Sequence, residues 1–233
     1  MNEFATIWQG LDWSVLIRML LSVVPILICL TIHELAHGLT AYALGDDTAK
    51  QMGRLTLNPI RHIDPMGFLM LLVFRFGWAK PVPVNMGNFQ RPKFGMAITA
   101  LAGPLSNFLL AALILLFQVP LARLQDAGGI GGQVAELMVL TAVISIFLGL
   151  FNLLPIPPLD GSKVLFSFLR DTRYYWLMRY ESYGIFFLFG LIFLGGFIIP
   201  GGVTGHIWNV MNMVFHWLVD ITAPPSQFLF GRM

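Results

Sequence analysis

The sequence predicts an all-α polytopic membrane protein with four to six transmembrane helices and a small re-entrant β-hairpin. Of the 233 residues, 57% are hydrophobic and only 11% are charged, whereas soluble domains average about 45–50% apolar and about 25% charged residues. The apolar residues also gather in runs near 20 residues long, which is the length that crosses the ~30 Å hydrocarbon core of a bilayer. A net charge of +2 is too small for a polyanion partner. Soluble, disordered and nucleic-acid-binding proteins are therefore excluded.

Several segments are apolar enough to be transmembrane helices at ~1.5 Å rise per residue. Four are strong candidates, and they cover residues 14–44, 94–117, 134–155 and 182–200. Two others are weaker: residues 66–79 are short and carry Arg75, and residues 205–222 hold enough polar side chains to lie along the interface instead.

The basic residues predict the orientation of these spans. Seven of the 14 Lys and Arg residues fall between residues 45 and 93, and four more fall between residues 160 and 181. Because cytoplasmic loops carry an excess of Lys and Arg, we expect both stretches on the cytoplasmic side of the membrane. The N-terminus and the 120–133 loop then face outward, and four spans that cross alternately satisfy this assignment.

Residues 52–92 do not have the pattern of a helix. Residues 54–58 (RLTLN) alternate with a period of two, and residues 79–85 (AKPVPVN) alternate with prolines, which suits only an edge strand. Irregular backbone is tolerated at membrane depth only where protein buries it or where it lines a wet cavity. We therefore expect a short re-entrant hairpin beside a hydrated cleft.

The first span contains an H-E-x-x-H motif, His33-Glu34-Leu35-Ala36-His37. Histidines at i and i+4 project from one face of a helix and can share one metal, and Glu34 can reach a metal-bound water. Ionisable residues in an apolar span are costly and are by default functional or paired. The alternative is a polar cluster at a helix end that satisfies neighbouring backbone groups.

A catalytic zinc usually has three protein ligands and an open fourth position, so a third ligand must come from elsewhere in the chain. The best candidate is Asp160, which follows a proline-rich break at the end of the 134–155 span. Both this span and the first one run inward, so Asp160 should reach the same membrane face as His33 and His37. The alternative role for Asp160 is an N-cap for a helix that begins near Ser162.

At these residues the chain resembles the site-2 protease family of intramembrane zinc metalloproteases. The family motif N-x-x-P-x-P-x-L-D-G is present at residues 152–161 beside the H-E-x-x-H motif, and a G-x-x-x-N motif is present at residues 103–107. The resemblance covers about residues 20–165. It implies a compact bacterial or archaeal form without a PDZ or CBS domain, with one Zn²⁺ held by His33, His37 and Asp160 and with Glu34 as the general base.

The chemistry of such a site assigns further candidate roles. Zinc polarises the scissile carbonyl and activates water, and Glu34 passes the proton of that water to the leaving amine. Asn107 or Asn152 could donate an amide hydrogen bond to the tetrahedral oxyanion, as the matching asparagines of the family suggest, but either could instead hold two helices together. Cys29, one turn before His33, could approach the metal or simply pack in the helix.

The proline-punctuated segment Lys80 to Asn85 is a candidate for substrate binding. A transmembrane helix must unwind before zinc can reach its carbonyls, and the unwound backbone then needs partners. Val82 and Val84 are expected to offer free N–H groups for β-pairing, while Pro81 and Pro83 block further strand growth. The alternative is that this segment merely turns the chain between two elements.

These observations predict an intramembrane zinc endopeptidase that cleaves a transmembrane segment of a single-span or other membrane protein. Residues 1–165 would form the metalloprotease membrane core, and residues 166–233 would form C-terminal transmembrane or interfacial helices. We expect a multi-pass protein of the cell membrane with its site open to the cytoplasm. Its expected partners are the lipid bilayer and the membrane protein substrate, with an oligomer as a further possibility. Nucleic acid is not expected as a partner. The competing function is a transporter that uses the same residues for a permeating cation, although no internal repeat is visible.

Overall fold

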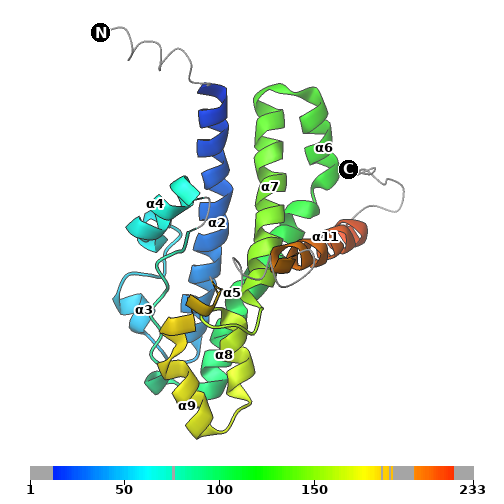
Figure 1. Cartoon of the computed structure of the whole chain (residues 1–233). Coiled ribbons are helices and arrows are strands. Elements are labelled where there is room, and N and C mark those ends of the chain that lie inside the picture. Colours follow the sequence, from blue (N-terminus) through cyan, green and yellow to red (C-terminus); the bar gives the residue numbers. More distant parts are fainter. Residues whose placement is uncertain (1–12, 75–76, 185, 189, 191–201, 223–233) are drawn as a thin grey trace.

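The computed structural model describes residues 13–74, 77–184, 186–188, 190 and 202–222, and these residues are mostly helical (Figure 1). Three long helices are α2 (Trp13–Ala43), α5 (Pro92–Leu115) and α7 (Gly129–Asn152). The shorter helices are α3 (Thr48–Gln51), α4 (Pro65–Phe74), α6 (Gln118–Ala127), α8 (Asp160–Ser167), α9 (Asp171–Arg179) and α11 (Gly202–Thr222). Three single turns of 3₁₀ helix are η1 (Pro59–His62), η2 (Met86–Asn88) and η3 (Glu181–Tyr183).

The three long helices pack on one another and form the centre of the protein. Helices α2 and α7 run in the same direction and α5 runs back between them, as crossing helices in a membrane do (Figure 1). Close packing depends on small residues: a Cβ on Gly149 of α7 would lie 3.2 Å from the Pro104 carbonyl of α5. Small residues at helix contacts are typical of membrane proteins, where they let backbones approach closely.

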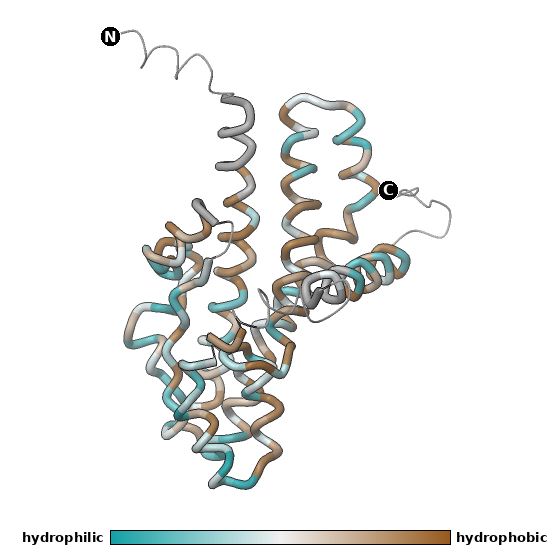
Figure 2. Tube along the Cα trace, viewed as in Figure 1, coloured by the Kyte–Doolittle hydropathy of each residue, from teal (hydrophilic) through white to brown (hydrophobic). Residues whose placement is uncertain are grey.

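Three helices in the described part of the chain are long and apolar enough to cross a membrane, namely Val23–Ala43, Pro92–Leu115 and Gly129–Asn152. They correspond to the first three predicted spans. Figure 2 shows hydrophobic residues along the middle of α5 and α7 and hydrophilic residues toward the end that holds α3 and α9. The fourth predicted span, residues 182–200, lies largely outside the described residues.

The predicted β-hairpin is not confirmed. The described residues contain no sheet and only an isolated antiparallel bridge between Ile63 and Ala79. Residues 66–79 instead contribute α4, which is too short to span a bilayer, and prolines at positions 81 and 83 prevent a regular ladder beyond the bridge. The outward loop predicted over residues 120–133 is also largely helical, because α6 packs against α7 there.

One backbone hydrogen bond and several side-chain contacts take the place of the missing strand pairing in the extended segment after the bridge. The Lys80 N–H donates to the His62 carbonyl at 2.9 Å, and the buried Arg54 guanidinium donates to the carbonyl of Lys80 at 2.6 Å. At the other end, the Asn85 N–H donates to the Asp46 carboxylate at 2.7 Å. The segment is therefore fixed at both ends although it belongs to no sheet.

Helix α11 is not among the candidate spans. It crosses α7 at a steep angle in Figure 1, and its Val219 packs into a core cluster with Leu115 of α5 and Ile146 of α7. The buried Gln118 side chain donates to the Val219 carbonyl at 3.3 Å and so joins α6 to α11. This position agrees with the interfacial alternative that the polar residues of 205–222 suggest.

Asp46 offers a test of how the extended segment is fixed. It is fully buried and accepts hydrogen bonds from Thr48, Asn85 and Asn88. Asp46→Ala should cost about 2 kcal/mol of folding stability because three residues lose their charged hydrogen-bond acceptor. The control Asp47→Ala removes an exposed carboxylate next to it. Equal thermal unfolding midpoints for the two variants in detergent would contradict this role.

The same contact has a defined pH dependence. Burial would raise the pKa of Asp46, but the hydrogen bonds from Thr48, Asn85 and Asn88 outweigh burial and lower it from its ordinary value of 3.8. A carboxyl with a lowered folded-state pKa contributes stability above its unfolded pKa and loses it as the pH falls through the folded pKa. The difference between wild type and Asp46→Ala should therefore be full above about pH 4 and shrink below it.

Candidate metal centre

Two histidines of α2 face the same point. His33 and His37 are separated by one helical turn, and their Nε2 atoms lie 3.0 Å apart. Both side chains are buried, with relative exposures of 4% and 8%. Their rings meet edge to face with centroids 4.6 Å apart. The i, i+4 spacing of the sequence motif thus gives the shared position that it predicts.

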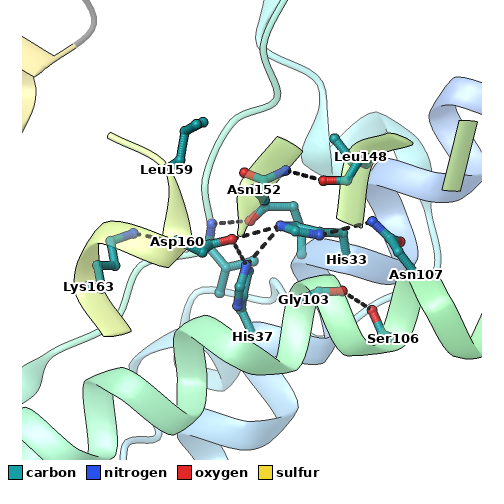
Figure 3. Close-up of polar contacts among 12 residues, drawn as sticks. His33, His37, Gly103, Ser106, Asn107, Leu148, Asn152, Leu159, Asp160 and Lys163 are labelled. Atoms are coloured by element: carbon teal, nitrogen blue, oxygen red, sulfur yellow. Dashed lines mark hydrogen bonds and ion pairs between the residues drawn. The ribbon is translucent and has the colours of Figure 1, made fainter. Parts of the chain in front are cut away.

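Asp160 brings a carboxylate oxygen to the same point from a distant part of the chain. Its Oδ2 lies 3.1 Å from Nε2 of His33 and 3.1 Å from Nε2 of His37 (Figure 3). Helix α8 begins at this residue, directly after the proline-rich break, and its N-cap is Leu159. The Asp160 carboxylate is directed at the two imidazoles, so the N-cap alternative does not describe this residue.

Gly161 explains how Asp160 reaches that position. A Cβ at residue 161 would lie 2.1 Å from the Leu153 carbonyl oxygen, so only glycine allows the start of α8 to fold back against the end of α7. The D-G pair of the motif therefore combines a ligand with the residue that lets the ligand approach.

The donor set fits a zinc ion. Two imidazole nitrogens and a carboxylate oxygen are typical zinc ligands, and atoms that share one tetrahedral zinc lie about 3.3 Å apart. Burial alone would raise the pKa of Asp160, but the nearby His37, hydrogen bonds from both imidazoles and the Lys163 ammonium hold that pKa below its usual range. The carboxylate is therefore ionised at neutral pH, as a metal ligand must be.

One face of α5 contacts both imidazoles. The Thr99 carbonyl lies 2.7 Å from Nδ1 of His37, so Nδ1 of this ring carries its proton and Nε2 is left with its lone pair. Gly103, one turn later, leaves space for both rings. Asn107, a further turn along, lies with Nδ2 3.1 Å from Nδ1 of His33 and is completely buried.

Glu34 is oriented by the extended segment. The Val82 N–H donates to Glu34 Oε2 at 2.7 Å, and the Val82 side chain is buried. The prediction that the Val82 N–H is free is therefore wrong, because the carboxylate on the neighbouring helix uses it. Among the described residues, no hydrogen bond is found for the Val84 N–H.

A cavity of about 530 Å³ opens on the three ligand atoms. Its lining includes both histidines, Glu34 and Asp160, together with Val82, Val84 and Asn152. Asn107 is not among the lining residues. The two asparagines with the same predicted role thus occupy different places: Asn152 faces the cavity and donates to the Leu148 carbonyl at 2.9 Å, whereas Asn107 lies behind His33 (Figure 3).

Sequence reasoning missed Lys163 and Glu181, which also line the cavity. Lys163 Nζ lies 3.5 Å from Asp160 Oδ1 and 3.4 Å from Glu181 Oε1. Burial acts to lower the pKa of Lys163, but the two carboxylates outweigh it and raise the pKa. The i, i+3 spacing of Lys163 from Asp160 was the available signal, since such residues are neighbours on a helix surface.

Two other candidates lie outside the centre. The Cys29 thiol is buried and contacts the Thr141 carbonyl on α7 at 3.4 Å, so it packs between helices. The His62 side chain is also buried, and its Nε2 lies 2.9 Å from the Thr56 carbonyl.

Gly103 provides a test of the packing around the imidazoles. A Cβ there would lie 2.5 Å from Nε2 of His37 and 2.7 Å from Cε1 of His33. Gly103→Ala should therefore displace both rings and weaken zinc binding at least tenfold in chelator competition, while the alanine favours the helix. Gly205→Ala, which adds a methyl group where no atom lies within 4 Å, should bind zinc like the wild type. Unchanged affinity in Gly103→Ala would contradict the packing seen here.

Comparison with known proteins finds a peptidase family and relatives that are named as zinc metalloproteases. The family model described as "Peptidase family M50" matches residues 120–195, which contain the motif around Asp160. The chain is 39% identical over 164 residues to "Putative zinc metalloprotease YwhC" of Bacillus subtilis, a match that covers 70% of this chain and 75% of that protein. It is 33% identical over 172 residues to "Putative zinc metalloprotease Rip2" of Mycobacterium tuberculosis, covering 70% of this chain and 62% of that protein.

No solved structure matches the chain. The resemblance to the site-2 protease family is nevertheless confirmed by the extent of the match to the Bacillus subtilis relative and by the family model. The chain belongs to peptidase family M50.

Proposed function

We propose that this protein is an intramembrane endopeptidase that hydrolyses a peptide bond in or near a transmembrane segment of another membrane protein. Membership of family M50 makes it a zinc metalloprotease. The single observation that supports the intramembrane site is the position of the ligand triad: His33 and His37 lie inside the Val23–Ala43 span and are buried. Ionisable groups at such a depth are costly and mark function.

His33, His37 and Asp160 would hold the zinc ion at the end of the cavity. When bound there, zinc supplies Lewis-acid polarisation of the scissile carbonyl and lowers the pKa of water toward neutrality. The chain itself must then move protons and stabilise charge. The three ligands come from two elements, α2 and α8, that meet at the cavity, so they also fix where the scissile bond must lie.

Glu34 would move the protons. It borders the cavity one residue from the first ligand, and the Val82 N–H holds one of its carboxylate oxygens at 2.7 Å. The other oxygen is then available to take a proton from the attacking water and to deliver it to the leaving amine. A base oriented in advance loses little conformational freedom at the moment of reaction.

Asn152 would stabilise the oxyanion. Its amide lies on the cavity wall, and one N–H is directed at the Leu148 carbonyl. An amide has a second N–H, which can donate to the developing negative charge of the substrate carbonyl. A single such donor typically contributes about 10²–10³ in rate.

The extended segment would pair with an unwound substrate. Val82 and Val84 line the same cavity as the ligands, and a substrate strand beside them could use the Val84 N–H without disturbing Glu34. Pairing with Val82 would require release of its contact with Glu34. We therefore assign the main pairing role to Val84, with the carbonyls of the neighbouring prolines as further acceptors.

The site would open to the cytoplasmic side of the cell membrane. The basic stretches at residues 45–93 and 160–181 surround the same ends of α2, α5 and α8 at which the cavity is built, and cytoplasmic loops are rich in Lys and Arg. The surrounding lipid bilayer and a single-span or other membrane protein substrate are the partners that this arrangement requires.

Glu34→Gln separates catalysis from metal binding. Gln keeps an oxygen that can accept from Val82 and keeps the three zinc ligands, but it removes the base, so cleavage should fall by about 10²–10⁴ while zinc content is unchanged. The measurement is co-expression with a panel of single-span membrane proteins, followed by immunoblotting for fragments. Glu136→Gln, at an exposed position of α7, is the matched control and should cleave normally. Near-normal cleavage by Glu34→Gln would rule out this mechanism.

Val84→Pro tests substrate pairing because it deletes the N–H that has no partner in the described structure. Cleavage of an intact transmembrane substrate should fall by about tenfold, whereas zinc content should not change, since the ligands lie elsewhere. Val84→Thr keeps both the N–H and the branched shape and should behave like the wild type. If Val84→Pro folds and cleaves at the wild-type rate, the segment does not hold the substrate.

A further inference from the structure

A stripe of α5 contacts the histidines His33 and His37, and it runs from the cavity wall at Thr99 to the buried Asn107. Thr99, Gly103 and Asn107 follow one another at intervals of four residues, so they lie on one face of the helix. The Thr99 carbonyl meets His37. Gly103 lies against both rings, and Asn107 meets His33 (Figure 3). The partner of His37 is a backbone carbonyl, whose role as acceptor is fixed. The partner of His33 is a side-chain amide, whose role depends on which of its atoms faces the ring.

The metal-binding role of His33 decides what that partner must be. A neutral imidazole carries one proton, so Nε2 has a free lone pair only when Nδ1 is protonated. Nε2 of His33 is the atom that faces Asp160 and His37. Its Nδ1 must then carry the proton and needs a hydrogen-bond acceptor. The Asn107 amide lies at hydrogen-bond distance from this nitrogen, at 3.1 Å.

The amide can provide that acceptor. In the structure Nδ2 of Asn107 faces the ring, and Oδ1 is buried with no hydrogen-bond partner among the residues that the structure describes. Oxygen and nitrogen of an amide have nearly the same shape, and their assignment follows from the network rather than from direct observation. A half-turn of the amide places Oδ1 against Nδ1–H of His33. This half-turn leaves an amide N–H unpaired in place of the oxygen, so the number of unpaired groups favours neither orientation. The ligand role of His33 then decides between them, because it requires an acceptor at Nδ1.

We propose that Asn107 is a positioning residue that accepts the Nδ1 proton of His33 through Oδ1 and thereby selects the tautomer that binds zinc. This inference rests on the proposed zinc site. It assigns to Asn107 a role distinct from oxyanion stabilisation, because the side chain is 0% exposed and does not line the cavity. Asn152, which does line the cavity, keeps the oxyanion role.

The surroundings of Asn107 are suited to fixing a ring. Its backbone carbonyl accepts a hydrogen bond from the buried Ser145 hydroxyl of α7 at 2.9 Å. This turn of α5 is therefore held by α7 on one side while its side chain holds α2 on the other. Partners of this kind, which bond the second nitrogen of a ligand histidine, fix ring orientation, and their loss typically costs about 10- to 100-fold in metal affinity.

The test is zinc affinity, measured by chelator competition on the full-length protein in detergent. Asn107→Leu has a similar volume but no acceptor and should bind zinc about 10- to 100-fold more weakly. Asn107→Asp keeps an acceptor oxygen and should bind within a few-fold of wild type, which a merely packing role would not produce. Asn152→Leu is the control and should keep wild-type affinity. Wild-type affinity in Asn107→Leu, or equal losses in the Leu and Asp variants, would overturn the inference.

A second measurement is made on the wild type, and a variant serves only to assign the signal. Nitrogen-15 NMR of histidine-labelled, zinc-loaded wild type should show His33 protonated at Nδ1, with the signal assigned through its absence in His33→Gln. Protonation at Nε2 would overturn the inference even if zinc binds tightly. Failure of the wild type to bind zinc at all would instead overturn the proposed function, so the two failures can be told apart.

Discussion

The structure depends on the convergence of two imidazoles and one carboxylate inside an apolar helix bundle. Without a shared cation such groups would be expensive to bury. Their three ligand atoms lie 3.0–3.1 Å apart, and much of the surrounding architecture serves that proximity. Gly103 gives room for the rings, Gly161 lets α8 fold back, and the α5 carbonyl of Thr99 sets one tautomer.

A second constraint governs the irregular segment between α2 and α5. Backbone that is neither helix nor sheet needs other partners when it lies against a membrane protein core. Arg54 and Asp46 satisfy groups at its two ends, and Glu34 accepts from its middle. The contact that satisfies the middle of the segment also orients the Glu34 carboxylate, so the packing of this segment and the geometry of the site are linked through Val82.

The three long helices and the meeting of the two imidazoles at one point can be predicted from the sequence because both leave local signals. Apolar runs identify α2, α5 and α7, and the i, i+4 histidines identify a shared ligand position. Contacts between distant segments leave no such signal. The alternation around Val82 suggests a strand, but its N–H is used by a side chain 48 residues away. In the same way, the sequence motifs suggest oxyanion stabilisation for both Asn107 and Asn152. The packing of α5 and α7 shows that Asn152 lines the cavity and that Asn107 does not.

The most direct test of the account is the zinc content of the purified protein and of Asp160→Ala, measured by mass spectrometry of the metal alongside cleavage. The wild type should hold close to one zinc per chain. Asp160→Ala should lose most of it together with activity, because two histidines alone leave the ion under-coordinated. Full zinc occupancy and full activity in Asp160→Ala would show that another residue completes the site and would contradict the arrangement described here.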